Sequence, residues 1–77
     1  MSELTQAVPA ATQRLILESE IADVQASIYR MTVRYRVNQK IGASEAELAA
    51  VKASLERLEM MLDAYQGELK ALGAAEA

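Results

Sequence analysis

Ile41-Gly42-Ala43-Ser44 is a turn sequence that separates two long segments of regularly spaced apolar residues. Glycine readily takes the left-handed backbone conformation that ends helices, and serine is a preferred residue at the start of a helix. In both flanking segments the large side chains recur every three or four residues, which is the spacing of one helix face. The stretch therefore predicts two helices that fold back on one another.

The apolar residues of the two segments match one another across this turn. In an antiparallel hairpin, facing positions have a constant sum of residue numbers. Six pairs obey this rule, namely Leu17 with Leu69, Ile21 with Tyr65, Val24 with Leu62, Ile28 with Leu58, Met31 with Leu55 and Tyr35 with Val51, and Leu48 and Leu72 extend the second series. We call these residues the seam. They predict an all-α, coiled-coil-like antiparallel two-helix hairpin, completed into a multi-helix bundle by oligomerisation or by a partner.

Capping signals set the expected boundaries of this hairpin. Gly42 suits the position after the first helix, and Ser44 with Glu47 has the spacing of a capping box, in which the Glu47 carboxylate reaches back to the Ser44 amide. Pro9 is expected at the first helical position, and Gly73 is expected to end the second helix. The predicted organisation is an N-terminal arm (1–8), a hairpin (9–73) with helices at about 9–41 and 45–72 around the turn (41–44), and a C-terminal tail (74–77). The arm has two interpretations, a free tail or a segment that docks on a neighbour.

Composition excludes most site chemistry. The 77 residues contain no cysteine and no histidine, which removes disulfides, the usual zinc ligands and the commonest nucleophile and base pairs. We therefore predict no catalytic residues, no metal site, no cofactor and no enzymatic activity. A chain this short buries little surface by itself, so oligomerisation is the expected remedy.

The chain also lacks signals for a membrane or for export. No apolar run approaches the length of a membrane span, and the first residues carry Glu3 but no basic segment. The net charge of -3 is modest. We expect a cytoplasmic protein, or part of a particle that is assembled in the cytoplasm, with no small-molecule substrate.

Each predicted helix carries a second apolar stripe, on nearly the opposite face from the seam. In the first helix it comprises Leu15, Ala22, Ala26, Tyr29, Val33 and Val37, and in the second Ala46, Ala50, Ala53, Met60, Ala64, Gly67 and Ala71. We call these two sets the outer stripes. One stripe per helix is enough for an isolated hairpin, so the outer stripes predict a partner interface. Alanine on a solvent-facing surface is the simpler explanation for the second helix, because alanine is a strong helix former.

Two charged regions are candidate binding sites. The segment 29–40 contains Arg30, Arg34, Arg36 and Lys40 without an acid, but its cations point to different sides of the helix, which argues against nucleic-acid binding. Near the termini, carboxylates gather on both helices without converging on one point. They match no metal-ligand pattern, although such an acidic end could dock a basic partner.

The sequence therefore favours a non-enzymatic structural or assembly subunit, or an adaptor, that self-associates or docks on a larger complex through its outer stripes. In size and predicted shape the chain is similar to small helical-hairpin assembly proteins, such as secretion-needle subunits, their co-chaperones and accessory proteins of bacteriophage particles, although no motif matches any of them specifically. The alternative is a small acidic regulator, inhibitor or co-chaperone that binds a basic surface of another macromolecule.

Overall fold

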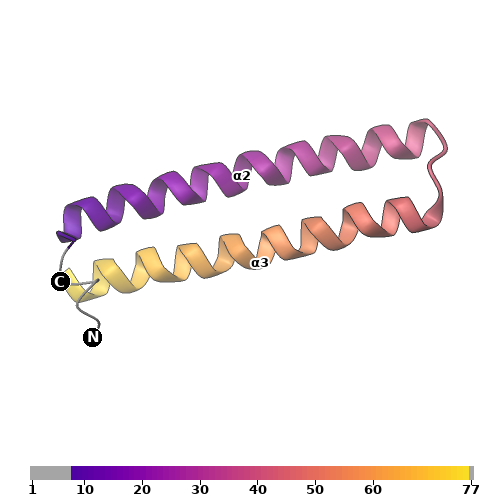
Figure 1. The fold of residues 1–77 in the computed structure, drawn as a ribbon. Coiled ribbons are helices and arrows are strands. Elements are labelled where there is room, and N and C mark those ends of the chain that lie inside the picture. Colours follow the sequence, from indigo (N-terminus) through magenta and orange to yellow (C-terminus); the bar gives the residue numbers. More distant parts are fainter. Residues whose placement is uncertain (1–7, 77) are drawn as a thin grey trace.

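Two antiparallel helices lie side by side along their whole length (Figure 1). The computed structural model describes residues 8–76, with α2 spanning Ala10–Lys40 and α3 spanning Glu45–Glu76. The extents of 50 × 19 × 18 Å are those of a rod. No strand occurs in this described part of the chain, and the predicted all-α helical hairpin is confirmed.

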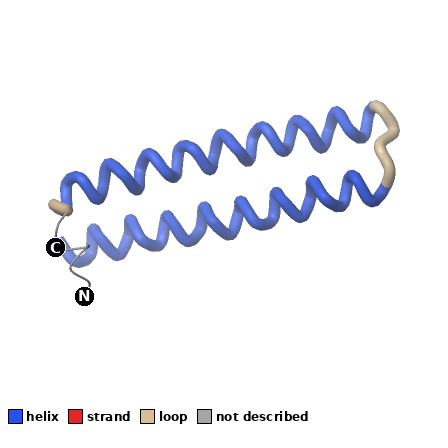
Figure 2. The backbone as a smooth tube through the Cα atoms, in the orientation of Figure 1, coloured by secondary structure: helices blue, strands red, loops and turns tan. Residues whose placement is uncertain are grey.

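A short loop reverses the chain between the helices (Figure 2). Gly42 has a φ of 75°. The amide of Gly42 donates to the carbonyl of Gln39 at 3.3 Å, and the amide of Ala43 donates to the carbonyl of Asn38 at 2.9 Å. This pair of bonds is a Schellman motif, which satisfies carbonyls that the end of a helix leaves without partners.

Ser44 caps the start of α3. Its Oγ accepts a hydrogen bond from the amide of Glu47 at 3.1 Å. The reciprocal bond differs from the expected capping box, because the Glu47 carboxylate accepts from the Ser44 hydroxyl at 3.2 Å rather than from the Ser44 amide. The Ser44 hydroxyl therefore accepts one of the two bonds and donates the other.

The start of α2 differs by one position from the sequence prediction. Pro9 is the residue before the helix, with an extended ψ of 149°, and its carbonyl already accepts from the amide of Gln13 at 2.9 Å. The Gln13 side-chain amide donates to the carbonyl of Val8 at 2.7 Å and holds the entering chain. Residues 1–7 of the predicted arm lie outside the described residues.

The predicted end of α3 at Gly73 was wrong. The helix continues through Gly73 to Glu76, so residues 74–76 of the predicted tail are helical, and Ala77 lies outside the described residues. A helical glycine costs only about 1 kcal/mol relative to alanine, and the alanines that follow are the best helix formers. Gly67 likewise lies inside α3 without interrupting it.

The core is a single line of side chains between the helices. Among the described residues only Val24 and Val51 are buried, with 5% and 8% of their surface exposed, and no side chain is fully buried. The two valines come from opposite helices near the middle and the turn end of the hairpin. The remaining seam residues are covered on one side only, because each helix has a single neighbour.

Two glycine substitutions separate backbone conformation from packing, since an added Cβ meets nothing within 4 Å at either Gly42 or Gly67. We expect Gly67→Ala to stabilise the hairpin by about 1 kcal/mol, because it removes unfolded-state entropy from a helical position. Gly42→Ala should destabilise it by about 1 kcal/mol, because φ there is positive. Chemical denaturation followed by circular dichroism measures both, and equal effects of the two substitutions would contradict this account.

A charge placed in the seam should unfold the chain. Leu58 is half-buried between the helices, so Leu58→Glu loses apolar burial and leaves a carboxylate without a partner, at a cost of about 2–5 kcal/mol. We expect loss of most helicity by circular dichroism. The matched control is Gln66→Glu, at an exposed position of the same helix, and an equal loss in the control would show that charge rather than the seam is responsible.

Candidate interaction surfaces

The seam is occupied by the hairpin itself. Each of its residues is buried or half-buried, and none belongs to the exposed surface: these are Leu17, Ile21, Val24, Ile28, Met31 and Tyr35 on α2, and Leu48, Val51, Leu55, Leu58, Leu62, Tyr65, Leu69 and Leu72 on α3. Tyr65 also makes a polar contact that the sequence did not suggest, since its hydroxyl donates to Oε2 of Glu20 at 3.3 Å. Most of the seam is therefore covered by the hairpin itself.

The outer stripes are open to solvent. Tyr29 is 68% exposed and Met60 is 73% exposed, and Val33 alone in this set is half-buried. The other members are all exposed, namely Leu15, Ala22, Ala26 and Val37 on α2, and Ala46, Ala50, Ala53, Ala64, Gly67 and Ala71 on α3. The α2 outer stripe carries the larger side chains, whereas the α3 outer stripe consists mostly of alanine and glycine. The first surface therefore protrudes more than the second.

A hollow of about 420 Å³ lies on the α2 outer stripe, lined by Tyr29, Val33 and Val37 together with Arg30 and Arg34. Its apolar members follow one another at steps of four residues, so they form one continuous patch on the helix. Arg30 and Arg34 place cationic side chains beside this apolar patch.

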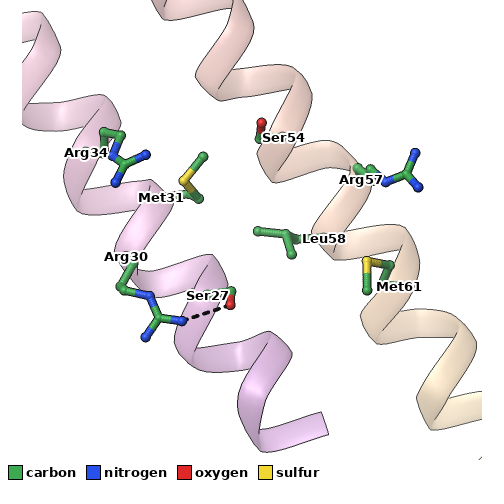
Figure 3. A pocket seen from close by; sticks show the side chains of 8 residues that line it. All are labelled: Ser27, Arg30, Met31, Arg34, Ser54, Arg57, Leu58 and Met61. Atoms are coloured by element: carbon green, nitrogen blue, oxygen red, sulfur yellow. Dashed lines mark hydrogen bonds between the residues drawn. The ribbon is translucent and has the colours of Figure 1, made fainter. Parts of the chain in front are cut away.

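A second opening lies between the helices (Figure 3). Its volume is about 370 Å³, and its lining comprises Ser27, Arg30, Met31 and Arg34 of α2 with Ser54, Arg57, Leu58 and Met61 of α3. We call it the arginine groove. Met31 and Leu58 point toward one another in its floor (Figure 3), and Nη2 of Arg30 donates to Oγ of Ser27 at 3.0 Å.

Three guanidinium groups border this groove without a carboxylate. In the described part of the chain, Arg30, Arg34 and Arg57 form no ion pair. Arg57 points away from α2 (Figure 3), so the three groups do not converge on one point. The groove is thus a basic, apolar-floored surface rather than a pocket that would hold a single small anion.

Sequence reasoning missed this groove because it treated the two helices one at a time. The constant-sum rule that pairs the seam residues also places Arg57 level with Tyr29 and Arg30, so the signal was available. Exposed aliphatic residues outside the outer stripes were also missed, and Ile16 and Ile41 are the clearest cases. The chain neighbours of Ile16 are Leu15 of the α2 outer stripe and Leu17 of the seam, so Ile16 falls between the two apolar series and belongs to neither.

Other site chemistries receive no support from the described residues. Among them, no three carboxylate, thiol or imidazole side chains come close enough together to hold a metal ion. The described helices have no stretch with the length and hydropathy needed to cross a membrane. Comparison with protein-family models, with curated proteins and with solved structures finds no match to this chain.

Proposed function

We propose that the chain is a non-enzymatic structural or adaptor subunit, which self-associates or docks on a larger protein complex through surfaces that the hairpin leaves open. The observation that carries the proposal is the combination of a minimal core with exposed large apolar residues. Only Val24 and Val51 are buried among the described residues, whereas Leu15, Tyr29 and Met60 are exposed.

The surface area supports a subunit that needs a partner. A compact monomer of 8.4 kDa is expected to expose about 4,600 Å², and this chain exposes 5858 Å². Its radius of gyration is 16.8 Å, against about 11–12 Å for a compact domain of this length. The excess surface is what an elongated subunit brings to an assembly.

The balance between the entropy cost of folding and the apolar burial of one seam also favours a subunit that needs a partner. Ordering the backbone costs about 1–2 kcal/mol per residue, and a single seam offsets this cost poorly because half-buried side chains lose only part of their contact with water. The chain has no cysteine or histidine for a disulfide or a zinc site. Association is the remaining common route to stability for so small a scaffold.

The outer stripes allow two kinds of assembly. Contact of like stripes is isologous and closes a dimer as a four-helix bundle, whereas packing the bulky α2 stripe on the small α3 stripe of the next copy gives a ring or a filament. By analogy of shape, we propose complexes built from many small helical subunits, such as phage particles or secretion assemblies, as the setting of this chain.

Substitutions on the α2 outer stripe test this proposal. Val33→Glu and Tyr29→Glu should lower the molecular mass measured by light scattering with size exclusion, while circular dichroism stays close to that of the wild type. The wild type should elute as a multiple of 8.4 kDa. Tyr29 is well exposed in the hairpin, so its substitution separates association from folding if Val33→Glu proves to disturb the helix.

The matched control is Gln25→Glu, which adds the same charge to the exposed surface of α2 between the seam and the outer stripe. It should leave the mass unchanged. A wild-type monomer with weak helicity would assign the open surfaces to a different protein. A monomer that is fully helical and unfolds cooperatively at every concentration would contradict the proposal, because such a hairpin needs no partner.

A further inference from the structure

α2 carries a third stripe beside the arginine groove, and its charge changes sign at its midpoint. In chain order its members are Ile16, Glu20, Asp23, Ser27, Arg30 and Arg34. Steps of three or four residues place them along one side of the helix, and the last three also line the groove. We call this set the charged stripe.

We propose that the charged stripe binds the charged stripe of a second copy of this chain, with the two α2 helices antiparallel. The inference rests on the proposed function for self-association, and it adds the face, the partner and the geometry of one contact. It leaves the outer stripes free for further subunits.

The charge pattern is complementary to itself in this arrangement. Facing positions of antiparallel helices have a constant sum of residue numbers, so when Ser27 faces its own counterpart, Arg34 lies opposite Glu20 of the second copy. Arg30 then falls within one residue of the position opposite Asp23 of the second copy. A parallel pair would place acids on acids and arginines on arginines, so the charges select the antiparallel pair.

The same charges are poorly arranged within one chain. Glu20 and Asp23 are three residues apart, and Arg30 and Arg34 are four apart, which are spacings at which like charges destabilise a helix. None of the four has an oppositely charged residue three or four positions away along α2. The helix therefore contains repulsion that nothing within it relieves.

Contacts within the hairpin do not relieve this repulsion either. Glu20 accepts a hydrogen bond from the neutral hydroxyl of Tyr65, and Arg30 donates to the neutral hydroxyl of Ser27. Within the described residues, Asp23 and Arg34 form no ion pair. Arg57 of α3 also borders the groove and adds a third positive charge to the lining. Carboxylates of a second copy would supply the opposite charge.

Apolar surface lies where the two copies would meet. The groove beside Ser27 has Met31, Leu58 and Met61 in its lining, so the two-fold arrangement brings two apolar floors together at its centre. Excluding water there strengthens the neighbouring pairs of arginine and carboxylate. The exposed Ile16 comes within about one helical turn of Ile41 of the second copy, and covering both removes apolar surface from water.

The contact needs only part of the surface. A stable interface takes about 800 Å² from each partner, and the chain exposes 5858 Å² in all. A dimer contact of ordinary size would therefore cover about one seventh of the surface of each copy.

A charge exchange between two variants tests the inference. Arg30→Glu makes the stripe wholly acidic except at Arg34, and Asp23→Arg makes it basic except at Glu20. We expect each variant alone to dimerise about tenfold more weakly than the wild type in sedimentation equilibrium, because two attractive contacts become repulsive. An equimolar mixture should recover the wild-type affinity, since each new charge then meets its opposite.

The helicity of the same samples separates this effect from misfolding. The new glutamate lies four residues before Arg34, and the new arginine lies three residues after Glu20, so both substitutions replace a repulsive pair within α2 by an attractive one. Each variant should be at least as helical as the wild type while it associates less. Variants that keep the wild-type affinity, or a mixture that fails to recover it, would overturn the inference.

Cross-linking at the predicted two-fold axis gives a second measurement. The chain has no cysteine of its own, so Ser27→Cys introduces a single thiol that faces its counterpart in the dimer, within reach of a disulfide. Mild oxidation should give a covalent dimer rapidly. Gln25→Cys, on the other side of α2, is the matched control and should cross-link slowly, and equal rates for the two variants would overturn the geometry.

The two proposals fail in different ways. If Val33→Glu lowers the mass and the charge exchange has no effect, subunits associate through the outer stripes and the charged stripe is not an interface. If the charge exchange behaves as expected and Val33→Glu has no effect, the charged stripe is the interface and the outer stripes are not. A wild type that is monomeric at every concentration overturns the inference outright.

Discussion

The single apolar seam between α2 and α3 is the constraint on which the rest of the structure depends. It fixes the register of the hairpin, because large side chains at three- and four-residue steps share one face of each helix, and they lie level with their partners only where the paired residue numbers keep their constant sum. It also limits stability, since each helix has only one neighbour and only Val24 and Val51 become buried among the described residues. The outer stripes are open for that reason, and so is the edge of the seam at the arginine groove, where Met31 and Leu58 line the opening.

The architecture follows from the sequence where a repeated signal supports it. Heptad spacing on both sides of Gly42 and the constant sum of paired residue numbers indicate the hairpin. This prediction is strong because many residues carry the same signal, so that no single residue decides it. Single-residue signals at the ends are weaker. Gly73 does not end α3, since the cost of one helical glycine is smaller than the helix preference of the alanines around it, and Pro9 precedes α2 because its carbonyl already accepts the first helical bond.

The arginine groove cannot be predicted from the residue pattern of either helix alone, because its lining comes from both helices. Arg30 and Arg34 belong to α2 and Arg57 belongs to α3, and their shared border exists only once the seam sets the two helices level with one another. The same step reveals that charges of one sign gather toward each end of one face. A chain without cysteine or histidine cannot gain stability from a disulfide or a zinc site, so contact through its surface is the remaining common source of stability. The pattern of its surface residues is therefore the best guide to its function.

We propose that this hairpin reaches its full stability through contact with another chain. The most direct test is thermal unfolding by circular dichroism over a wide range of protein concentration. If association stabilises the fold, the Tm rises steadily with concentration, because mass action favours the folded assembly. A Tm that is the same at every concentration, with a cooperative transition and full helicity, would show that the seam alone is sufficient and would contradict the account.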